Sequence, residues 1–237
     1  ILNYDTQRLP MATVSKPEIL SHLVDKKHLT SLDFADAFFH IKLDKESQPH
    51  TAFYSSVHSQ RFCFTRAPQG LRNSPLYLKL LLDKIFADMA DSCILFFDDL
   101  LIATDGCLDD HLKIVDEVLK RIIKAGLKLR PKKLNLAKKQ IEFLGMIFEQ
   151  GRVSIPNAKL EAFNKLPSPK SPKTAKSLIC ALSYYRHFVP DFAGLSREIM
   201  ELSNVHPKTF LWTPTHETKL RKLIKAVCDN SKLYLPD

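Results

Sequence analysis

The sequence predicts an α+β fold, with mixed strands and helices in the first part of the chain and mainly helices afterwards. Up to about residue 149, short runs of β-branched and aromatic residues are interleaved with amphipathic stretches. Beyond residue 156, apolar residues recur at spacings of three and four, which is typical of helices that bury one face. With 237 residues, 45% of them hydrophobic, the chain can form one large domain or two to three smaller ones.

The first strand is expected at 30–34, followed by a short helical or turn stretch at 35–39. Two further strands, 51–54 and 61–65, flank the polar stretch 55–60. Two short strands joined by a polar stretch predict a β-hairpin.

A helix is expected to begin at Ser74, with Ser74 as its N-cap and Pro75 in the first helical position. Its apolar stripe consists of Leu78, Leu82, Ile85 and Met89. Two apolar runs follow, 93–97 and 100–104, and they are separated only by Asp98 and Asp99. This pattern predicts a tight hairpin with two carboxylates at its tip.

The remaining elements are mostly helical. A helix with the stripe Leu112, Val115, Leu119 and Ile122 is expected to end at Gly126, and residues 141–148 predict a strand pair or one bent strand. A short helix should run from Pro156 to before Pro167, and a proline-rich linker should follow it. The last two helices are predicted from two stripes, Leu178, Leu182, Tyr185 and Val189, and then Leu220, Leu223 and Val227.

Composition excludes several classes of protein. Apolar runs are all far shorter than the roughly 18 residues that span a bilayer, so we expect no membrane segment. The five cysteines are odd in number and never spaced C-x-x-C, which argues against a zinc site or a disulfide framework. Only 6 glycines are present, so a glycine-rich phosphate loop is excluded.

The charge is unevenly distributed along the chain. Residues 1–119 contain 12 basic and 17 acidic side chains, a net charge of −5, whereas residues 120–237 contain 23 and 9, a net charge of +14. A strongly basic half indicates a polyanionic partner. A solvated basic surface is the alternative.

Three carboxylates stand in or beside apolar strands, namely Asp33, Asp98 and Asp99. Asp is unfavourable in such positions unless another interaction compensates. A hard divalent cation would do so, and three carboxylates from neighbouring strands can hold two ions about 3.5–4 Å apart for phosphoryl transfer. The alternatives are an exposed turn for Asp98-Asp99 and a helix N-cap for Asp33.

Several sequence blocks occur in a fixed order along nearly the whole chain. They are Leu32-Asp33-Phe34-Ala35-Asp36-Ala37-Phe38-Phe39, the block 47–53, Pro68-Gln69-Gly70-Leu71-Arg72-Asn73-Ser74-Pro75, Phe96-Phe97-Asp98-Asp99, the block 127–133, Phe143-Leu144-Gly145, and Ser183-Tyr184-Tyr185-Arg186-His187-Phe188-Val189-Pro190-Asp191-Phe192. Their order and spacing resemble the reverse transcriptases of retroviruses and long-terminal-repeat retrotransposons, especially the Gypsy-like and gammaretrovirus-like groups. In that family the blocks 32–39, 68–75 and 127–133 correspond to motifs A, B and D.

The resemblance implies a right-hand polymerase palm, an antiparallel sheet backed by helices, with partial fingers and a mainly helical thumb. It implies partial fingers plus palm at 1–149, the thumb at 150–206 and the start of a connection segment at 207–237. It also implies a segment of a Pol polyprotein. The upstream fingers residues that hold the triphosphate would precede Leu2-Asn3, and a ribonuclease H domain would follow residue 237.

The resemblance also implies the roles of individual residues. Asp33, Asp98 and Asp99 would be catalytic and, with the carbonyl of Phe34, would bind two Mg²⁺ ions, for which Mn²⁺ can substitute. The nucleotide would be bound by the amides of Asp36 and Ala37, by Phe38 as the steric gate, by Gln69 and by Lys133. The alternatives are a core aromatic for Phe38, a role that suits Phe39 better, and a surface charge for Lys133.

The nucleic acid would be contacted by Phe97 beside the primer terminus, by the primer grip Phe143-Leu144-Gly145, and by the thumb residues Lys170, Lys173, Lys176 and Arg186. This sequence departs from the family pattern at three places. Ala67 replaces the usual Leu, Phe96 replaces the more frequent Tyr, and Phe97 is bulkier than the usual residue.

We therefore expect an RNA-directed DNA polymerase that adds deoxynucleoside triphosphates to a primer on an RNA or DNA template. It would act in the cytoplasm within a retroelement particle, or in the nucleus, with no membrane partner. The main alternative is an inactive or domesticated module that binds nucleic acid or a partner protein. Another two-metal phosphotransferase is a weaker alternative, because it gives no role to motif B or to Tyr184-Tyr185-Arg186.

Overall fold

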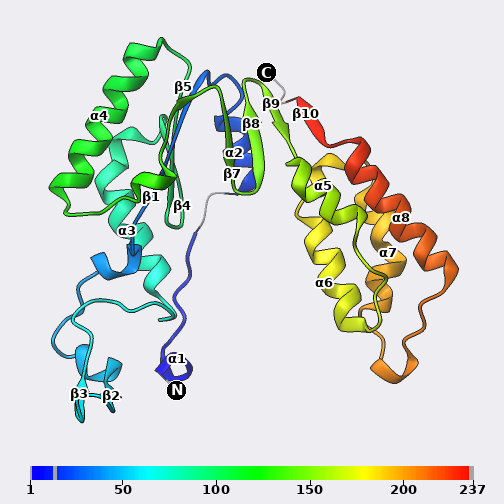
Figure 1. The fold of residues 1–237 in the computed structure, drawn as a ribbon, viewed down its shortest axis with the longest axis horizontal. Coiled ribbons are helices and arrows are strands. Elements are labelled where there is room, and N and C mark those ends of the chain that lie inside the picture. The colour runs from blue at the N-terminus through cyan, green and yellow to red at the C-terminus, as the bar shows by residue number, and fades with distance from the viewer. Residues whose placement is uncertain (1, 13–14, 235–237) are drawn as a thin grey trace. The chain divides into compact units, whose positions relative to one another are not determined.

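The computed structural model describes residues 2–12 and 15–234, which form two compact units. The first unit comprises residues 2–143 and 149–151, and the second comprises 144–148 and 152–234 (Figure 1). The ends of the predicted domain ranges, residues 1 and 235–237, lie outside the described residues. The names fingers, palm, thumb and connection stay predictions for these units.

The first unit is built on a four-stranded sheet with the order β4-β5-β1-β6. Its strands are β1 (His28–Asp33), β4 (Cys93–Phe96), β5 (Asp99–Thr104) and β6 (Asn135–Lys138). β1 is antiparallel to both β5 and β6, and β4 is antiparallel to β5. In the register of β1 and β5, Asp33 lies opposite Asp99.

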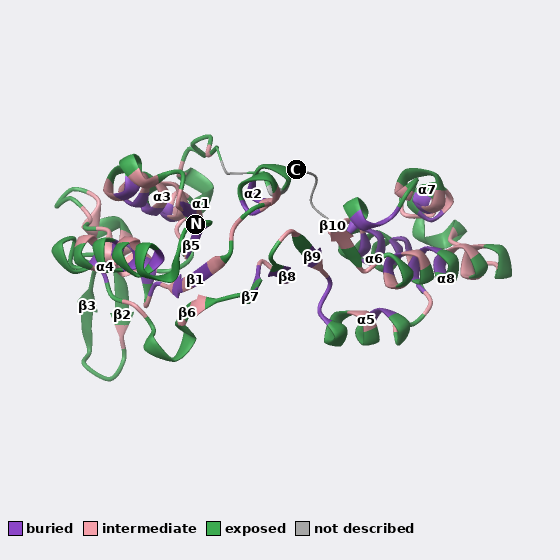
Figure 2. Cartoon of the chain, turned by 90° about the horizontal axis from the view of Figure 1, so that it is seen from above, coloured by how far each residue is buried: buried purple, intermediate pink, exposed green. Residues whose placement is uncertain are grey.

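Two helices, α3 (Ser74–Phe86) and α4 (Leu108–Lys124), cover the same side of this sheet (Figure 1). Buried residues lie where these helices meet the strands (purple in Figure 2). The shared core includes Leu32, Phe34, Leu78, Leu82, Phe86, Leu100, Ile102, Val115, Val118 and Ile122. The prediction of an antiparallel sheet backed by helices is confirmed, because these alternating and 3.6-period apolar positions bury each other.

Smaller elements complete the first unit. They are α1 (Leu2–Asp5), α2 (Lys16–His22), β2 (Phe53–Ser55), β3 (Gln60–Phe62), β7 (Gln140–Phe143) and the 3₁₀ turns η1 (Ala37–His40), η2 (Gln48–Thr51), η3 (Ala87–Met89) and η4 (Pro131–Lys133). The predicted hairpin at 51–65 is confirmed, with Phe53 paired with Phe62.

Two local predictions in the first unit are wrong. Ser74 is not the N-cap of α3 but its first residue, and the cap is Asn73, whose side chain is engaged elsewhere. Leu112 of the predicted stripe is 38% exposed, whereas the polar His111 is buried in its place. Both errors arise because a tertiary hydrogen-bond partner, absent from any local pattern, decides where these side chains point.

The second unit contains the strands β8 (Met146–Glu149), β9 (Arg152–Ser154) and β10 (Lys232–Tyr234), which are neighbours in the order β10-β9-β8. Its helices are α5 (Asn157–Asn164), α6 (Pro172–Ser183), α7 (Phe192–Leu202) and α8 (Pro214–Asp229), with the 3₁₀ turns η5 (Arg186–Phe188) and η6 (Pro207–Thr209). α7 packs against α6 and α8, and α5 packs against α8. The second unit is therefore mainly helical, as the sequence predicts.

The helix predicted from Leu178 to Val189 is shorter than expected. α6 ends at Ser183, although Tyr185 and Val189 are buried as the stripe required. The chain continues in a 3₁₀ turn, in which the amide of Phe188 donates to the carbonyl of Tyr185 at 3.0 Å. Pro190 follows directly and cannot extend an α-helix, because it has no amide hydrogen to donate.

The part of the chain that the structure describes was searched for membrane-spanning helices and for disulfides. No helix there has the length and apolar composition needed to cross a bilayer. The thiols of all five cysteines are free.

A buried histidine ties α4 to the sheet. Its Nε2 is 2.7 Å from the hydroxyl of Thr30 on β1, and its Nδ1 is 2.8 Å from the hydroxyl of Thr104 on β5. This residue, His111, is fully buried, and burial together with the neighbouring His28 lowers the pKa of its imidazole. Both ring nitrogens are therefore used while the ring is neutral, with one nitrogen donating and the other accepting.

We expect acid to destabilise the first unit through His111. The unfolded imidazole takes up a proton near its ordinary pKa of 6.5, whereas the folded imidazole resists protonation. The stability that the neutral ring provides is therefore complete above pH 6.5 and is lost as the pH falls toward and through the lowered pKa. Thermal melts at pH 8 and pH 5.5 would measure this loss, and His111→Gln should reduce it. His50→Gln, at an exposed ring, should leave the pH dependence unchanged.

Candidate active site

Three carboxylates meet at one end of the sheet in the first unit. Asp33 is the last residue of β1, and it pairs with Asp99, the first residue of β5. Asp98 stands in the two-residue turn between β4 and β5, and its carbonyl accepts a hydrogen bond from the amide of Phe34 at 3.4 Å. Antiparallel pairing of β1 with β5 thus brings together two acids, Asp33 and Asp99, that are 66 residues apart in sequence.

Burial and the negative charges of these carboxylates raise the pKa of Asp99. The pKa of Asp99 is raised, first by burial and then by the carboxylates of Asp98 and Asp33, while Lys133 opposes the shift. Asp98 is exposed, and the side chain of Asp33 is only 14% exposed. Burial and repulsion both disfavour the charged form, so this cluster favours the approach of a cation.

Asp33 already has two basic partners. The guanidinium of Arg130 is 3.1 Å from its Oδ1, and the Lys133 ammonium is 2.8 Å from its Oδ2. The amide of Arg130 also donates to the carbonyl of Asp33 at 2.9 Å, which fixes the motif D segment beside β1. Sequence reasoning selected Lys133 and missed Arg130, although Arg130 lies three residues earlier in the same basic run.

The donor set fits a hard divalent ion in chemical type. Carboxylate and carbonyl oxygens are the ligands that Mg²⁺ and Mn²⁺ prefer, and the repulsion acting on Asp99 is what such an ion would relieve. Within residues 2–12 and 15–234, however, no three acidic, histidine or cysteine side chains are grouped so as to hold one ion. An ion would therefore have to replace Arg130 and Lys133 at Asp33.

The other interpretations of these acids can now be decided. Asp33 ends a strand and does not cap a helix, so the N-cap alternative is wrong. The turn alternative holds for Asp98, which is exposed, but Asp99 is a strand residue in register with Asp33.

The turn residue Phe97 has an unusual backbone. Its φ is +54°, in the left-handed region that is costly for a bulky residue. Its ring is 40% exposed and meets Phe96 edge-on, with centroids 4.8 Å apart. A cavity of about 750 Å³ lies beside Phe97 and is lined also by Arg8 and Arg72. Phe97 therefore lines a hollow whose other lining residues are mainly apolar, with two arginines among them.

Motif A continues from β1 into η1. Asp36 has a φ of +49° and is exposed, Ala37 is buried, and the Asp36 carboxylate is 3.8 Å from the guanidinium of Arg130. Phe38 packs against the hydrophobic core, whereas Phe39 contacts Phe64 at a centroid distance of 6.2 Å. The suggestion that Phe39 suits the core better than Phe38 is therefore wrong, because the 3₁₀ turn directs Phe38 inward.

The motif B turn is clasped by the N-terminal segment. The side-chain amide of Asn3 donates to the carbonyl of Gly70 at 2.6 Å and accepts from the amide of Arg72 at 2.8 Å. Asn73 binds the backbone of Gln7 at 2.9 Å and that of Leu9 at 3.3 Å. The φ of Gly70 is +91°, which suits glycine. Gln69, which precedes it, is exposed.

Sequence reasoning missed the structural roles of Asn3 and Asn73. Asparagine has both a donor and an acceptor in its side chain, so each residue can hold two backbone groups at once. The only available signal was the presence of Asn73 within the resembling block 68–75.

The predicted primer-grip residues are divided between the two units. Phe143 ends β7 in the first unit and is buried. Leu144 and Gly145 belong to the second unit, with φ values of +51° and +67°. There the Tyr184 hydroxyl donates to the carbonyl of Leu144, and the Tyr185 hydroxyl donates to that of Gly145 at 3.2 Å.

The four predicted phosphate contacts of the second unit are all exposed. Lys170 precedes α6, Lys173 and Lys176 lie on its first two turns, and Arg186 begins η5. α6 buries its opposite side through Ala175, Ile179 and Leu182. The charged side chains are thus free to meet solvent or a polyanion.

Comparison with known proteins identifies the family. The family model described as reverse transcriptase (RNA-dependent DNA polymerase) matches residues 4–148, which is more than half of the chain. This chain belongs to the reverse transcriptase family. The identification agrees with the resemblance read from the motifs, and residues 4–148 include the three acids, motif B and motif D.

Its relatives include retrovirus-related Pol and Gag-Pol polyproteins. The Pol polyprotein from the transposon gypsy of Drosophila melanogaster is 31% identical over 196 residues, covering 82% of this chain and 18% of the relative. The Gag-Pol polyprotein of Gibbon ape leukemia virus is 28% identical over 215 residues, covering 87% of this chain and 13% of the relative. The chain thus spans less than a fifth of each of these polyproteins.

Solved reverse-transcriptase structures share the fold. The foamy viral protease-reverse transcriptase in complex with double-stranded DNA matches all of this chain and 49% of its own, with a TM-score of 0.88 and 24% identity. The same protein in complex with an RNA/DNA hybrid matches 95% of this chain and 30% of its own, with a TM-score of 0.83 and 25% identity. The predicted palm-type α+β fold is confirmed.

Because the carboxylates of this reverse-transcriptase domain repel one another, we expect Asp98→Asn to stabilise the metal-free protein. The pKa of Asp99 is raised, so ionising Asp99 costs stability as the pH rises through the acid range and beyond. Removing the neighbouring charge at neutral pH should raise the melting temperature by about 1–3 °C in chelator. Saturating Mn²⁺ should stabilise the wild type but much less the variant. A lower melting temperature for Asp98→Asn in chelator would contradict this electrostatic account.

Proposed function

We propose that this chain is the core of an RNA-directed DNA polymerase that adds deoxynucleotides to a primer 3′-hydroxyl. The observation on which the proposal chiefly rests is the meeting of Asp33, Asp98 and Asp99 at one end of the sheet, in a chain of the reverse transcriptase family. Mutually repelling carboxylates are costly, and nucleotidyl transfer gives them a use.

Asp33, Asp98 and Asp99, with the carbonyl of Phe34, would hold two Mg²⁺ or Mn²⁺ ions. When bound, the ions would supply charge stabilisation to the attacking hydroxyl and to the leaving pyrophosphate. The chain's own part is to hold Asp33 and Asp99 opposite each other through the β1–β5 pairing. Lys133, 2.8 Å from Asp33, is placed to donate a proton or positive charge to the leaving group once it is released from that carboxylate.

The nucleotide pocket would be formed around motif A. Phe38 is fixed by its packing against the core, which suits a steric gate, because a gate must not yield to a 2′-hydroxyl. The amides of Asp36 and Ala37 would approach the triphosphate, and the exposed Gln69 would contact the nucleotide from the motif B turn.

Nucleic acid would be bound at several places. Phe97, which lines a hollow together with Arg8 and Arg72, would contact the primer end, and Phe143, Leu144 and Gly145 would form the primer grip. Lys170, Lys173, Lys176 and Arg186 would contact phosphates. The two similar solved structures are complexes with double-stranded DNA or with an RNA/DNA hybrid, and this similarity supports a primer–template partner here.

We further propose a division into partial fingers plus palm at 1–149, thumb at 150–206 and connection from 207. The relatives are polyproteins, so a ribonuclease H domain and other Pol domains are expected neighbours. A retroelement particle in the cytoplasm, or the nucleus, remains the proposed location.

A primer-extension assay tests the polymerase proposal. The full chain should extend a labelled DNA primer on an RNA template with Mg²⁺ or Mn²⁺ and deoxynucleotides. Asp98→Asn should abolish extension, a loss of at least about a thousandfold, because it removes one of the proposed ligands. The matched control is Asp105→Asn, an exposed carboxylate just beyond the other end of β5, which should keep wild-type activity.

The same assay separates the polymerase from the alternative, a module that only binds nucleic acid or a partner protein. That alternative is favoured by the ion pairs of Asp33 with Arg130 and Lys133, because they occupy both oxygens of this carboxylate. If the wild type binds primer–template yet never extends it, and Arg130→Gln does not release activity, the chain is a binding module. If Asp98→Asn still extends the primer, the metal assignment is wrong.

We expect the second unit to supply salt-dependent affinity for duplex nucleic acid. Changing Lys170, Lys173 and Lys176 to Ala should flatten the log–log plot of affinity against salt by up to about 2.7, since each phosphate contact contributes about 0.9. Fluorescence anisotropy measures this slope. A control triple at Lys113, Lys120 and Lys124, exposed on α4, removes the same charge and should leave the slope unchanged. Equal slopes for the two triples would show that α6 makes no phosphate contacts.

A further inference from the structure

The turn at Leu144 and Gly145 in the second unit has a backbone that is unfavourable to form. The φ values of these residues are +51° and +67°. The left-handed region suits Gly145, which has no Cβ, but it is costly for Leu144, whose Cβ crowds the backbone. Such a conformation persists only where surrounding contacts hold it.

Two tyrosine hydroxyls at the end of α6 supply such contacts. The hydroxyl of Tyr184 donates to the carbonyl of Leu144, and the hydroxyl of Tyr185 donates to the carbonyl of Gly145 at 3.2 Å. Each bond joins residues that are 40 positions apart in sequence, so neither belongs to the turn itself. Both carbonyls of the turn are therefore held from outside it.

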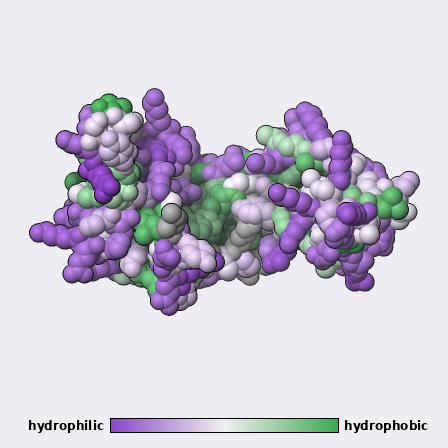
Figure 3. Space-filling model, turned by 90° about the horizontal axis from the view of Figure 1, so that it is seen from below, coloured by the Kyte–Doolittle hydropathy of each residue, from purple (hydrophilic) through white to green (hydrophobic). Residues whose placement is uncertain are grey.

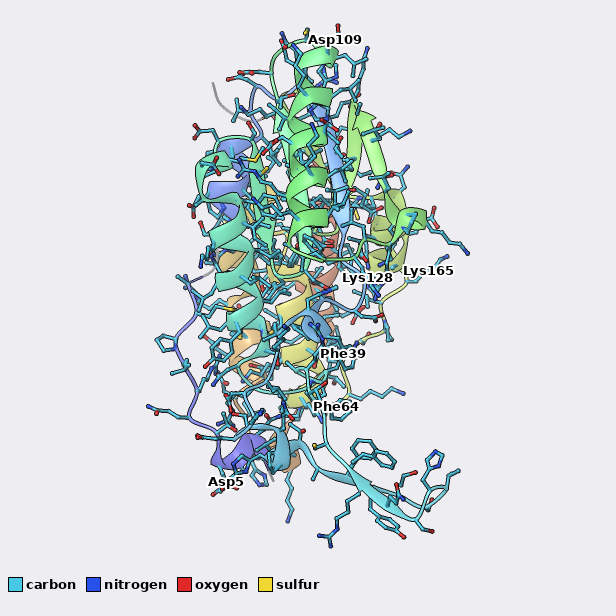
Figure 4. All side chains as sticks on the ribbon, turned by 90° about the vertical axis from the view of Figure 1, so that its left-hand side faces the viewer. Asp5, Phe39, Phe64, Asp109, Lys128 and Lys165 are labelled. Carbon is cyan, nitrogen blue, oxygen red and sulfur yellow. The ribbon has the colours of Figure 1, made fainter. Side chains whose placement is uncertain are left out.

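The ring of Tyr185 is itself fixed by an aromatic group inside the second unit. Its centroid is 5.4 Å from that of Phe163 on α5 and 4.9 Å from that of Tyr184, with steep angles between the planes. Figure 4 labels Lys165, which directly follows α5. The surface of the second unit is mainly hydrophilic on the face shown in Figure 3 (at the right), whereas Phe163, Tyr185 and Phe188 are buried. A packed ring keeps its hydroxyl in one place.

Holding a carbonyl also orients an amide. In a planar trans peptide the C=O and N–H groups point in opposite directions. The bond from Tyr184 to the carbonyl of Leu144 therefore directs the amide of Gly145 away from Tyr184. A donor that is oriented before its ligand arrives loses less conformational entropy on binding, so the hydroxyls would favour any ligand that this backbone meets.

We propose that the hydroxyls of Tyr184 and Tyr185 are positioning groups for the primer grip, holding the Leu144–Gly145 turn so that its backbone meets the primer in one orientation. The orientation of a primer rests on the proposed polymerase function. The holding of the turn does not, because the contacts concerned lie within the second unit. In this role the hydroxyls act through the turn and do not touch the nucleic acid.

Hydrogen exchange with mass spectrometry tests whether the hydroxyls hold the turn, with the full chain in chelator and without nucleic acid. Tyr184→Phe with Tyr185→Phe keeps both rings and removes both hydroxyls. Amides of residues 144–147 should exchange about tenfold faster, because about 1.4 kcal/mol, the equivalent of tenfold, is within what two hydrogen bonds contribute. Exchange in α7 should stay unchanged, which separates local opening from global unfolding.

The matched control is Ser203→Ala. Its hydroxyl donates to the carbonyl of Met200 at 2.6 Å, so this variant also removes a bond from a hydroxyl to a carbonyl within the second unit. It should leave exchange at residues 144–147 unchanged.

Primer extension tests whether the held turn acts on the primer. In the double variant, kcat/KM for primer–template should fall about tenfold, whereas KM for the deoxynucleotide should stay within about twofold, since the turn is proposed to meet the primer and not the nucleotide. Ser203→Ala should keep the wild-type kcat/KM.

The two measurements together decide the proposal. Unchanged exchange at residues 144–147 would overturn it, and a kinetic loss without faster exchange would show that a hydroxyl contacts the nucleic acid itself. Faster exchange with a wild-type kcat/KM would leave the hydroxyls a role in stability alone and would overturn the positioning role. A wild type that never extends primers would refute the polymerase proposal and with it the role toward the primer, whereas exchange would still decide whether the hydroxyls hold the turn.

Discussion

The antiparallel pairing of β1 with β5 determines where the charges of this protein meet. β5 is apolar from Leu100 to Ala103, and Leu32 of β1 is buried with Leu100 and Ile102 in the core that these strands share with α3 and α4, so this core sets their register. Because of that register, Asp33 and Asp99 lie opposite each other at the end of the sheet. The packing of hydrophobic side chains thus holds carboxylates in an arrangement that their own electrostatics opposes, and the network around His111 secures the same two strands at their other end.

The elements of the fold could largely be predicted, because hydrophobic periodicity reflects burial. The hairpin around Asp98, the helices α3 and α4 and the mainly helical second unit all follow from such patterns. Their ends could not be predicted as well. α3 begins at Ser74 and not at Pro75, and its N-cap Asn73 binds the backbone of residues 7 and 9. A local sequence pattern does not contain a hydrogen-bond partner that lies 64 residues away.

For the active site, the acids were predictable as a group and their surroundings were not. An Asp between two apolar runs can be recognised in a sequence because a charged residue interrupts the hydrophobic pattern. Arg130 gave no such signal, since a basic residue in a basic segment is ordinary. Its importance comes from its contacts with Asp33, an ion pair of 3.1 Å and a backbone hydrogen bond of 2.9 Å. The inward packing of Phe38 depended likewise on the 3₁₀ geometry of η1, which the alternation of aromatic residues in motif A does not specify.

The clasp between the N-terminal segment and motif B has a consequence for how the site is assembled. Its hydrogen bonds join residues 3–9 to residues 70–73, so closing it requires a loop of more than sixty residues, although it lies outside the hydrophobic core. The sheet and its helices can therefore form first, with the motif B turn taking its final shape only when the N-terminal segment docks. A single peptide-bond cleavage near Leu9 would then leave the four-stranded sheet and its helices intact, while the segment before the cut would be held to the motif B turn by hydrogen bonds alone and could dissociate from it.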